Sequence, residues 1–247
     1  MNIYYDFDKL PHFKQTVITV GSFDGVHSGH RMLLRKVVAE AKAADTESIV
    51  VTFEPHPREV LAGGDNVRIL TSLKEKIWLL AKEGIDNLVV ARFTPQFAAL
   101  TSEEFVRDVL CARLHAGTVV AGFNHRFGSD RQAPADRLER LAAQYGFKVC
   151  RMDACTVGGQ KVSSTVVRGL IDSGDIQGAA ELLGHPYFIV ADVVKSEVMI
   201  AHPHKQLPPD GSYRVKVDGV ADELYVGVGR LMLGACSTTS DAMIEFV

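Results

Sequence analysis

The sequence predicts an α/β fold in which a doubly wound, parallel sheet is followed by a small antiparallel β module. Up to about residue 185, short β-branched runs alternate with amphipathic stretches of helical period, beginning with 17–21, 29–44 and 48–53. Strands separated by helices require crossover connections, which make neighbouring strands parallel. Beyond residue 185 the apolar alternation has the period of strands only, which indicates an antiparallel module.

The same alternation continues through the rest of the first region. It predicts helices over 72–84, 102–117, 135–146, 162–174 and 176–184, and strands over 87–93, 118–123 and 147–152. The second region has strand patterns over 186–194, 211–217, 223–229 and 242–247.

The boundary between the two regions is predicted at His185–Pro186. The residue before a proline is disfavoured in a helix, and Gly184 offers a helix stop just ahead of it. We therefore expect one domain over 1–185 and a β domain over 186–247. The proline-rich tract 202–211 is expected to be a surface connection.

Composition and charge exclude several functional classes. The chain has 247 residues, of which 47% are hydrophobic and 23% charged, as in ordinary folded proteins. Its 27 Lys and Arg against 30 Asp and Glu give a formal net charge of −3, so we expect no nucleic-acid partner. The four cysteines form no CxxC pair, which argues against a disulfide framework. An acidic N-terminal segment and the lack of a long apolar run predict a cytoplasmic protein without a membrane span.

The first predicted strand runs into the segment GSFDGVHSGH (21–30), which places two histidines at a helix start. His27 and His30 are three residues apart, so both imidazoles lie on the same side of the first turn. Gly25 and Gly29 let the backbone approach a ligand and leave amides free to bind anions. We interpret this turn as a phosphate site in which the histidines stabilise phosphate oxygens. Ordinary helix capping and a zinc site are the alternatives, although no third zinc ligand stands at a recognisable spacing.

A second motif, SSTVVR (163–168), also begins a predicted helix. Its hydroxyls and free amides precede a guanidinium that can bind phosphate oxygens in a bidentate manner. By itself the motif is typical of a helix N-cap. Ligands of a doubly wound sheet collect at the carboxyl ends of the strands, and both motifs follow strand ends, so we interpret both as phosphate-binding.

Together, GSFDGVHSGH and SSTVVR resemble the two signatures of the HxGH nucleotidyltransferase superfamily, which has a Rossmann-like sheet. Four further segments are similar, in order and spacing, to the adenylyltransferase module of bacterial bifunctional riboflavin kinase/FAD synthetases. These segments are TFEPHPREVL (52–61), ILTSLKEKIWLLAKEGID (69–86), GFNHRFG (122–128) and ELLGHPY (181–187). The resemblance covers nearly all of 14–187. It implies FMN adenylyltransferase activity, in which FMN and ATP give FAD and pyrophosphate with Mg2+.

The resemblance also implies roles for individual residues. His27, His30 and Arg168 are expected to be catalytic, holding the ATP phosphates and stabilising the transferring α-phosphorus. Nucleotide and phosphate contacts are expected from Gly21, Phe23, Asp24, Gly25, Gly29, Ser163, Ser164 and Thr165. Flavin contacts are expected from Phe53, Pro55, His56, Pro57, Asn124 and Arg126. Asn124 departs from the family pattern, which has an acidic residue there, and no residue is assigned to a metal.

The second region resembles a reduced riboflavin kinase barrel through LPPDGSYRVKV (207–217) and ELYVGVG (223–229). The GxPTAN-type turn of that family has no counterpart, and the sequence ends at Val247, before the family's later acidic catalytic residue. We therefore expect no riboflavin kinase activity. Two alternatives to an active FMN adenylyltransferase remain open: an inactive flavin- or nucleotide-binding regulatory protein, and a transferase for another phosphorylated acceptor.

Overall fold

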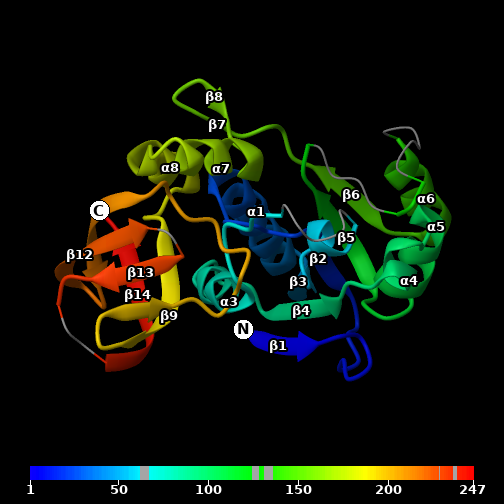
Figure 1. The fold of residues 1–247 in the computed structure, drawn as a ribbon. Coiled ribbons are helices and arrows are strands. Elements are labelled where there is room, and N and C mark those ends of the chain that lie inside the picture. Colours follow the sequence, from blue (N-terminus) through cyan, green and yellow to red (C-terminus); the bar gives the residue numbers. More distant parts are fainter. Residues whose placement is uncertain (62–66, 124–127, 131–135, 228, 236–237) are drawn as a thin grey trace. The chain divides into compact units, whose positions relative to one another are not determined.

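The computed structural model describes residues 1–61, 67–123, 128–130, 136–227, 229–235 and 238–247 (Figure 1). The chain forms two compact units, each assembled from separate segments. The first unit comprises 1–23, 30–67 and 80–154, and the second comprises 24–29, 68–79 and 155–247. The domain boundary near residue 185 stays a prediction.

The first unit is built on a six-stranded, parallel sheet, as the sequence predicted. Its strand order is β1 (Asn2–Tyr5), β4 (Asn87–Arg92), β3 (Glu47–Glu54), β2 (Thr16–Val20), β5 (Ala116–Ala121) and β6 (Lys148–Arg151). Ile18 of β2 pairs with Ile49 and Val119 on either side. Every residue of β2 is buried, which explains its continuous apolar and β-branched character. The edge strand β1 was not predicted.

Two helices of this part of the chain follow their predicted ranges, one predicted helix differs, and two short helices were not predicted. Helix α1 (Ser28–Ala43) begins directly after the histidine turn and buries Leu33, Leu34, Val37 and Ala41, an apolar stripe of helical period. The single helix predicted over 102–117 is instead a short helix, α5 (Ser102–Glu104), continued by a π-helical segment, η1 (Phe105–Cys111). Helix α6 (Arg137–Tyr145) follows the predicted range 135–146, whereas α2 (Pro57–Leu61) and α4 (Pro95–Ala98) were not predicted.

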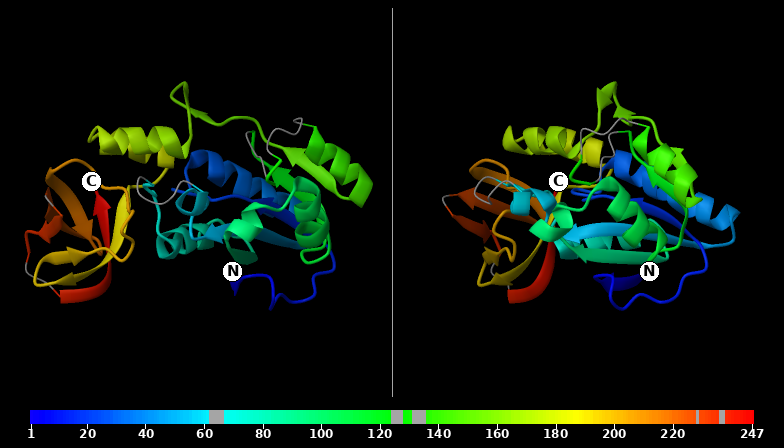
Figure 2. Two further views of the ribbon diagram at one scale, coloured as in Figure 1. Left: turned by 45° about the vertical axis from the view of Figure 1, so that its right-hand side comes forward. Right: turned by 90° about the vertical axis from the view of Figure 1, so that its right-hand side faces the viewer.

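The second unit contains a closed antiparallel barrel, visible in both views of Figure 2. Its strand order is β10 (Glu197–Met199), β13 (Arg230–Leu233), β12 (Val220–Gly227), β11 (Gly211–Val217), β14 (Thr238–Phe246) and β9 (Phe188–Val194). The sequence predicted an antiparallel β module, which is confirmed, but not the short strands β10 and β13. Their few residues carry little alternation on which a prediction can rest.

Helices pack with the barrel within the second unit. These elements are α7 (Ser164–Asp172), α8 (Ile176–Leu183) and the part of α3 (Leu73–Ala81) up to residue 79, with a small hairpin of β7 (Thr156–Val157) and β8 (Gln160–Lys161). Val167 and Ile171 of α7 belong to the same hydrophobic cluster as Ile189, Leu224 and Ile244 of the barrel. The helix that carries Arg168 and the barrel therefore share one core.

The tract 202–211 is not simply a surface connection, and that expectation is wrong for three of its residues. Lys205, Gln206 and Pro208 are buried, and Ile69 forms an isolated parallel bridge with Lys205. Proline prevents regular structure in this tract, but it does not prevent the backbone from pairing with a neighbouring segment.

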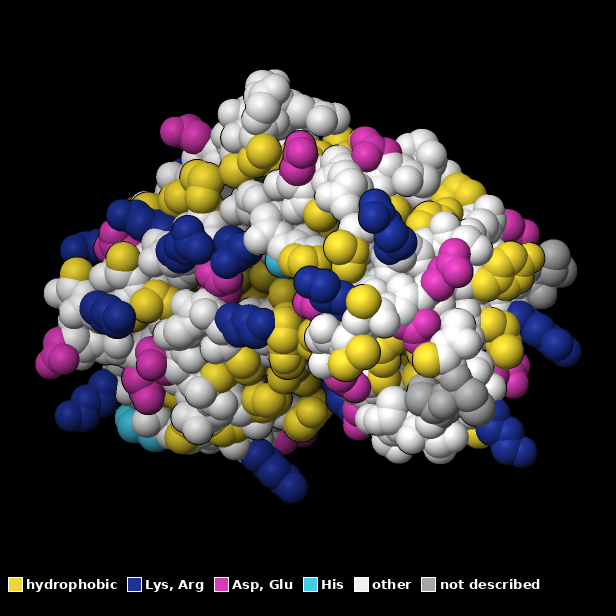
Figure 3. Space-filling model, turned by 90° about the vertical axis from the view of Figure 1, so that its left-hand side faces the viewer, with side chains coloured by type: hydrophobic (Ala, Val, Ile, Leu, Met, Phe, Trp, Pro, Cys, Tyr) yellow, Lys and Arg dark blue, Asp and Glu magenta, His cyan; other side chains and the backbone are white. Residues whose placement is uncertain are grey.

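Acidic and basic side chains are interspersed on the face drawn in Figure 3, in keeping with the small formal net charge. Among the helices of the described residues, none has the length and apolar character needed to cross a membrane.

Candidate active site

The loop between β2 and α1 has an unusual backbone conformation. Phe23 and Val26 have φ values of 47° and 39°, in the left-handed region that a β-branched residue rarely adopts. Gly25 has φ +83°, and a Cβ there would stand 2.7 Å from the Leu70 side chain. The tertiary contacts of this loop therefore impose its shape just ahead of His27.

Asp24, in this loop, has a buried carboxylate, and the residue is 1% exposed. Its Oδ1 accepts hydrogen bonds from the backbone amides of Leu70, at 2.8 Å, and Thr71, at 3.1 Å. Its Oδ2 lies 2.6 Å from Nη1 of Arg168. Two amides and a guanidinium thus compensate the buried charge of Asp24.

The start of helix α7 meets the same loop. Ser163 caps the helix by accepting from the Val166 amide at 3.3 Å, and Ser164 donates its hydroxyl proton to the Asp24 carbonyl at 2.9 Å. Thr165 is exposed in the first turn, and Arg168 follows one turn later. The structure therefore brings SSTVVR against the loop that precedes His27.

His27 itself is largely buried beside the start of α1. A Cβ at position 29 would lie 3.3 Å from its ring and 3.3 Å from Cys155, so only glycine leaves both undisturbed. Burial, opposed by the charge of Asp24 and reinforced by Arg168 and His185, lowers the pKa of His27 to about 4. At neutral pH the imidazole is uncharged and donates through one nitrogen only.

Sequence reasoning used His185 only as a boundary marker, but its ring lies on the same loop. Its Nε2 is 3.1 Å from the Gly25 carbonyl oxygen, and its Nδ1 is 2.8 Å from that of Pro186. The αL stop of α8 at Gly184 directs the following histidine into this position. The segment ELLGHPY, in which a glycine stop directly precedes the histidine, could have been used to predict this position.

His30 lies in the first turn of α1, within the first unit. Its ring meets the edge of Phe23 with ring centroids 5.1 Å apart and planes inclined by 64°. This contact fixes the orientation of the imidazole.

The first unit also contains an aromatic cavity of about 290 Å³. Phe53, His56 and Pro57, three of the residues expected to contact flavin, line it, whereas Pro55 is exposed and does not. The walls are completed by Val20, Gly21, Ser22, Arg58, Phe93, Phe97, Ala98, Leu100, Phe105 and Gly128. Asn124 and Arg126 lie outside the described residues.

The phenylalanines of this cavity form a cluster that the sequence analysis missed. The ring centroid of Phe53 lies 5.3 Å from that of Phe93 and 5.8 Å from that of Phe97. The spacing FTPQF at the end of β4 was a usable signal, because Thr94 and Pro95 begin a helix that turns Phe97 back toward Phe93. Aromatic walls with a few polar groups suit a flat, conjugated ligand.

The part of the chain that the structure describes holds no cluster of typical metal-binding side chains. No group of three or more His, Cys, Asp or Glu side chains there is placed to hold an ion. The Asp24 carboxylate, close to the phosphate motifs, is already bonded to Leu70, Thr71 and Arg168.

Comparisons with known proteins agree with this architecture. Residues 9–166 match the family model described as FAD synthetase. The chain is 34% identical over 225 residues to the "Bifunctional riboflavin kinase/FMN adenylyltransferase" of Escherichia coli, covering 87% of this chain and 72% of that one. It is 34% identical over 202 residues to the "FAD synthetase" of Listeria monocytogenes, covering 81% of each.

One solved structure has the same fold over the whole chain. It is described as a macrolide-efflux protein from Streptococcus pneumoniae. The two chains superpose with a TM-score of 0.85 and are 23% identical, and the match covers all of this chain and 90% of that one. At this identity the likeness concerns the fold alone.

The family model and the named relatives, together with this parallel sheet and the motifs that follow its strands, identify the chain as a nucleotidyltransferase enzyme. More particularly, the chain belongs to the FAD synthetase family.

Proposed function

We propose that this chain is an FMN adenylyltransferase that transfers AMP from ATP to FMN and releases FAD and pyrophosphate. The observation that carries the proposal is the convergence of His27, Asp24 and Arg168 in a family whose members are named for FAD synthesis. An uncharged imidazole donor and an oriented guanidinium match a polyphosphate substrate.

The proposed chemistry is a direct displacement. An oxygen of the FMN phosphate attacks the α-phosphorus of ATP, a new P–O bond forms, and the bond to the bridging oxygen breaks. The electron pair of that bond leaves with pyrophosphate. Because the attacking phosphate is already ionised, no general base and no covalent enzyme intermediate are needed, and catalysis consists of alignment and charge stabilisation.

Within this reaction, His27 donates a hydrogen bond to an ATP phosphate oxygen, and Arg168 and His30 stabilise the charge that develops in transfer. Asp24 orients Arg168, because its own oxygens are already engaged. The first turn of α7, with Ser163, Ser164 and Thr165, offers backbone amides to phosphate. Gly21, Phe23, Gly25 and Gly29 shape the loop that lets the nucleotide come close to the backbone.

The aromatic cavity is proposed to take the flavin ring. Phe53, Phe93 and Phe97 supply apolar walls, and His56, whose Nδ1 accepts from the Arg58 amide at 3.1 Å, is held at its edge. Pro55, Asn124 and Arg126 stay predicted flavin contacts.

Magnesium is proposed to enter with ATP rather than to occupy a protein cage. Mg2+ keeps several waters and is commonly held by substrate phosphates with few protein ligands. This agrees with the absence, among the described residues, of a three-ligand cluster. Bound in this way, the ion would neutralise charge on the leaving pyrophosphate.

We also propose that the chain lacks riboflavin kinase activity. Between β10 and β11, where the kinase family has its GxPTAN-type turn, Lys205 donates to the Leu70 carbonyl and Gln206 donates to Asp172. Both side chains form hydrogen bonds within the second unit, which supports a structural role for the segment.

The test is chromatographic. Purified protein is given Mg2+ and ATP with either FMN or riboflavin, and FAD, FMN and pyrophosphate are measured. We expect FAD and pyrophosphate in equal amounts from FMN, and no product from riboflavin. FMN formed from riboflavin would overturn the loss of kinase activity. No FAD from folded protein would overturn the transferase, and flavin binding without turnover would then favour a regulatory protein.

A further inference from the structure

Lys205 is a buried cation that the proposed chemistry does not use. Its Nζ lies 2.6 Å from Glu75 Oε2, 2.7 Å from the Leu70 carbonyl oxygen and 2.9 Å from the Phe188 carbonyl oxygen. The side chains of Lys205 and Glu75 are each 1% exposed. The three ammonium protons thus have three acceptors, which offsets the cost of removing the charge from water.

One of these acceptors belongs to a residue that also bonds to the proposed phosphate site. The Leu70 carbonyl accepts from Lys205, while the Leu70 and Thr71 amides hold the Asp24 carboxylate. The Thr71 hydroxyl also accepts from the Gly25 amide at 3.0 Å. Lys205 therefore anchors the short segment that presents donors to Asp24.

The backbone on both sides of Lys205 strengthens this anchor. The Ile69 amide donates to the His204 carbonyl at 2.9 Å, and the Gln206 amide donates to the Ile69 carbonyl at 2.8 Å. Glu75 accepts from the Ser72 amide and from the Val190 amide, both at 2.8 Å. The segment before α3 is thus bonded to the barrel from several directions.

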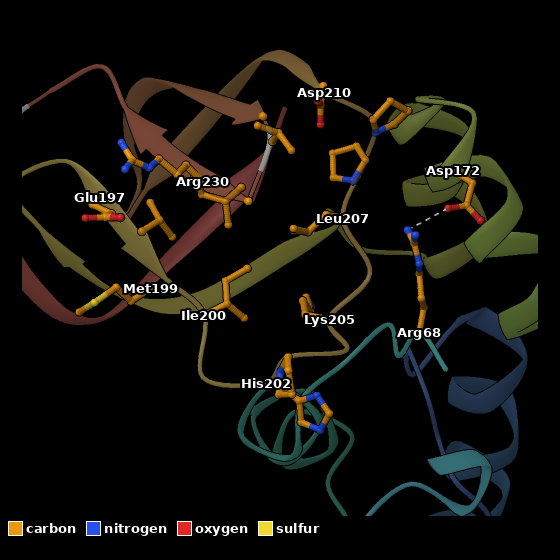
Figure 4. Close-up of a pocket in the computed structure, with 18 residues that line it drawn as sticks. Arg68, Asp172, Glu197, Met199, Ile200, His202, Lys205, Leu207, Asp210 and Arg230 are labelled. Atoms are coloured by element: carbon orange, nitrogen blue, oxygen red, sulfur yellow. Dashed lines mark ion pairs between the residues drawn. The ribbon is translucent and has the colours of Figure 1, made fainter. Parts of the chain in front are cut away.

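A second connection reaches the helix that carries Arg168. Gln206 Nε2 donates to Asp172 Oδ1 at 2.8 Å, and Asp172 is the last residue of α7. Figure 4 shows Lys205, Asp172 and Arg68 around a cavity of about 670 Å³, with the Arg68–Asp172 ion pair, 3.6 Å long, drawn as a dashed line.

We propose that Lys205 is a positioning residue for adenylyl transfer: it fixes Leu70 and Thr71, which fix Asp24, which orients Arg168. The inference rests on the proposed function. We call these five residues the relay, and all of them belong to the second unit. The barrel then contributes to the transferase reaction by holding its phosphate-binding arginine in place.

The first test replaces Lys205 with methionine. We expect kcat/KM for ATP to fall by about tenfold or more, because small displacements of a phosphate-binding group are costly in rate. The affinity for FMN, followed by flavin fluorescence, is expected to stay within about twofold, since the described residues lining the aromatic cavity include none of this relay. The control is Lys216→Met, the same change at an exposed position of β11.

A double-mutant cycle distinguishes an effect of Lys205 through Arg168 from a general effect of Lys205 on the stability of the protein. If Lys205 acts through Arg168, Lys205→Met changes kcat/KM by less than about twofold when Arg168 is already alanine. An equal additional loss in both backgrounds would overturn the proposal.

A second variant is needed because Lys205→Met leaves the charge of Glu75 buried without its partner, which could unfold the protein. The double variant Glu75→Gln/Lys205→Met removes both charges and still lacks the donor to the Leu70 carbonyl. We expect it to share the kinetic defect of Lys205→Met. Normal kinetics in this variant would contradict the relay.

Amide hydrogen exchange tests the relay without catalysis. Exchange at Leu70 and Thr71 is expected to be at least about tenfold faster in the double variant than in Leu224→Ala, which removes a buried barrel side chain outside the relay. If the wild-type protein forms no FAD, the proposed function fails while this measurement still decides the relay. Unchanged exchange at both amides would overturn it.

Discussion

The guanidinium of Arg168 lies 2.6 Å from the carboxylate of Asp24, joining residues 144 positions apart in the sequence. Asp24 is in turn held by the Leu70 and Thr71 amides, so its oxygens are not free to move with Arg168. The orientation of the arginine therefore depends on the loop before His27 and on the segment with Leu70 and Thr71, which carries no phosphate motif.

Replacing Asp24 with asparagine tests this dependence. Without the negative charge, Arg168, whose side chain is 12% exposed, loses its ion pair with Asp24, so we expect the free energy of unfolding to fall by about 3–5 kcal/mol. We expect kcat/KM for ATP to fall by roughly 10- to 100-fold. Urea unfolding and FAD formation measure the two effects. Asp8→Asn is the control, because its ion pair with Arg113 is exposed and contributes about 0–1 kcal/mol. Wild-type kinetics in Asp24→Asn would refute the positioning role.

His30 is expected to act on the transition state rather than on folding. His30→Ala should lower kcat by on the order of a hundredfold, as when a preorganised donor to a developing charge is removed. The rate of FAD formation at saturating ATP and FMN is the measurement, with circular dichroism as the check on folding. A near-normal rate in folded protein would remove His30 from the mechanism.

His27 should make the protein less stable as the pH falls. Its pKa is about 4 in the folded protein against 6.5 as the reference value for the unfolded chain, so between these values only the unfolded chain binds the proton. The contribution is fully present above pH 6.5 and is lost as the pH falls toward 4, by roughly 2–4 kcal/mol. Urea unfolding at pH 7.0, 5.5 and 4.5 should show a shallower dependence in His27→Gln. Parallel curves for the two proteins would contradict the lowered pKa.

Phe97 should contribute to flavin binding and not to nucleotide binding. Phe97→Ala removes an aromatic wall of the cavity, so we expect KM for FMN to rise by about tenfold and KM for ATP to change little. Phe147→Ala is the control, because Phe147 belongs to the hydrophobic cluster against which Phe97 packs but does not line the cavity. Equal effects of both substitutions on KM for FMN would show that the cavity is not the flavin site.

Gly25 should not tolerate a side chain. Gly25→Ala combines a left-handed backbone with a Cβ only 2.7 Å from Leu70, so we expect loss of stability and of activity. Gly84→Ala is the matched control, since its φ is also positive, at +76°, but a Cβ there meets nothing within 4 Å. We expect Gly84→Ala to lose about 1–2 kcal/mol and to keep its activity. If Gly25→Ala behaves like Gly84→Ala, the close approach to Leu70 is unimportant.

Capping residues and glycines in the sequence predicted most helix ends correctly. They failed where a distant residue forms a hydrogen bond with the expected capping side chain. Ser163 caps α7 as predicted, because the hydroxyl and the amide it accepts from are three residues apart. At the predicted helix over 102–117, the cap is Thr101 rather than Ser102, whose hydroxyl is bonded to Asp130. Gly117, the last residue of that predicted range, lies in β5, and His115 adopts the left-handed conformation ahead of it.

Patterns in the sequence are sufficient to predict the parallel sheet, the antiparallel β module and the positions of the histidine and SSTVVR motifs. These follow from periodicity and from spacings within one turn or one strand, which are local properties of the chain. Three features are visible only in the folded chain: Asp24 holds Arg168, Lys205 lies buried against Glu75, and four phenylalanines line one cavity. Contacts between residues far apart in sequence depend on which faces of the elements meet and on which buried charges must be compensated, and no local pattern encodes either.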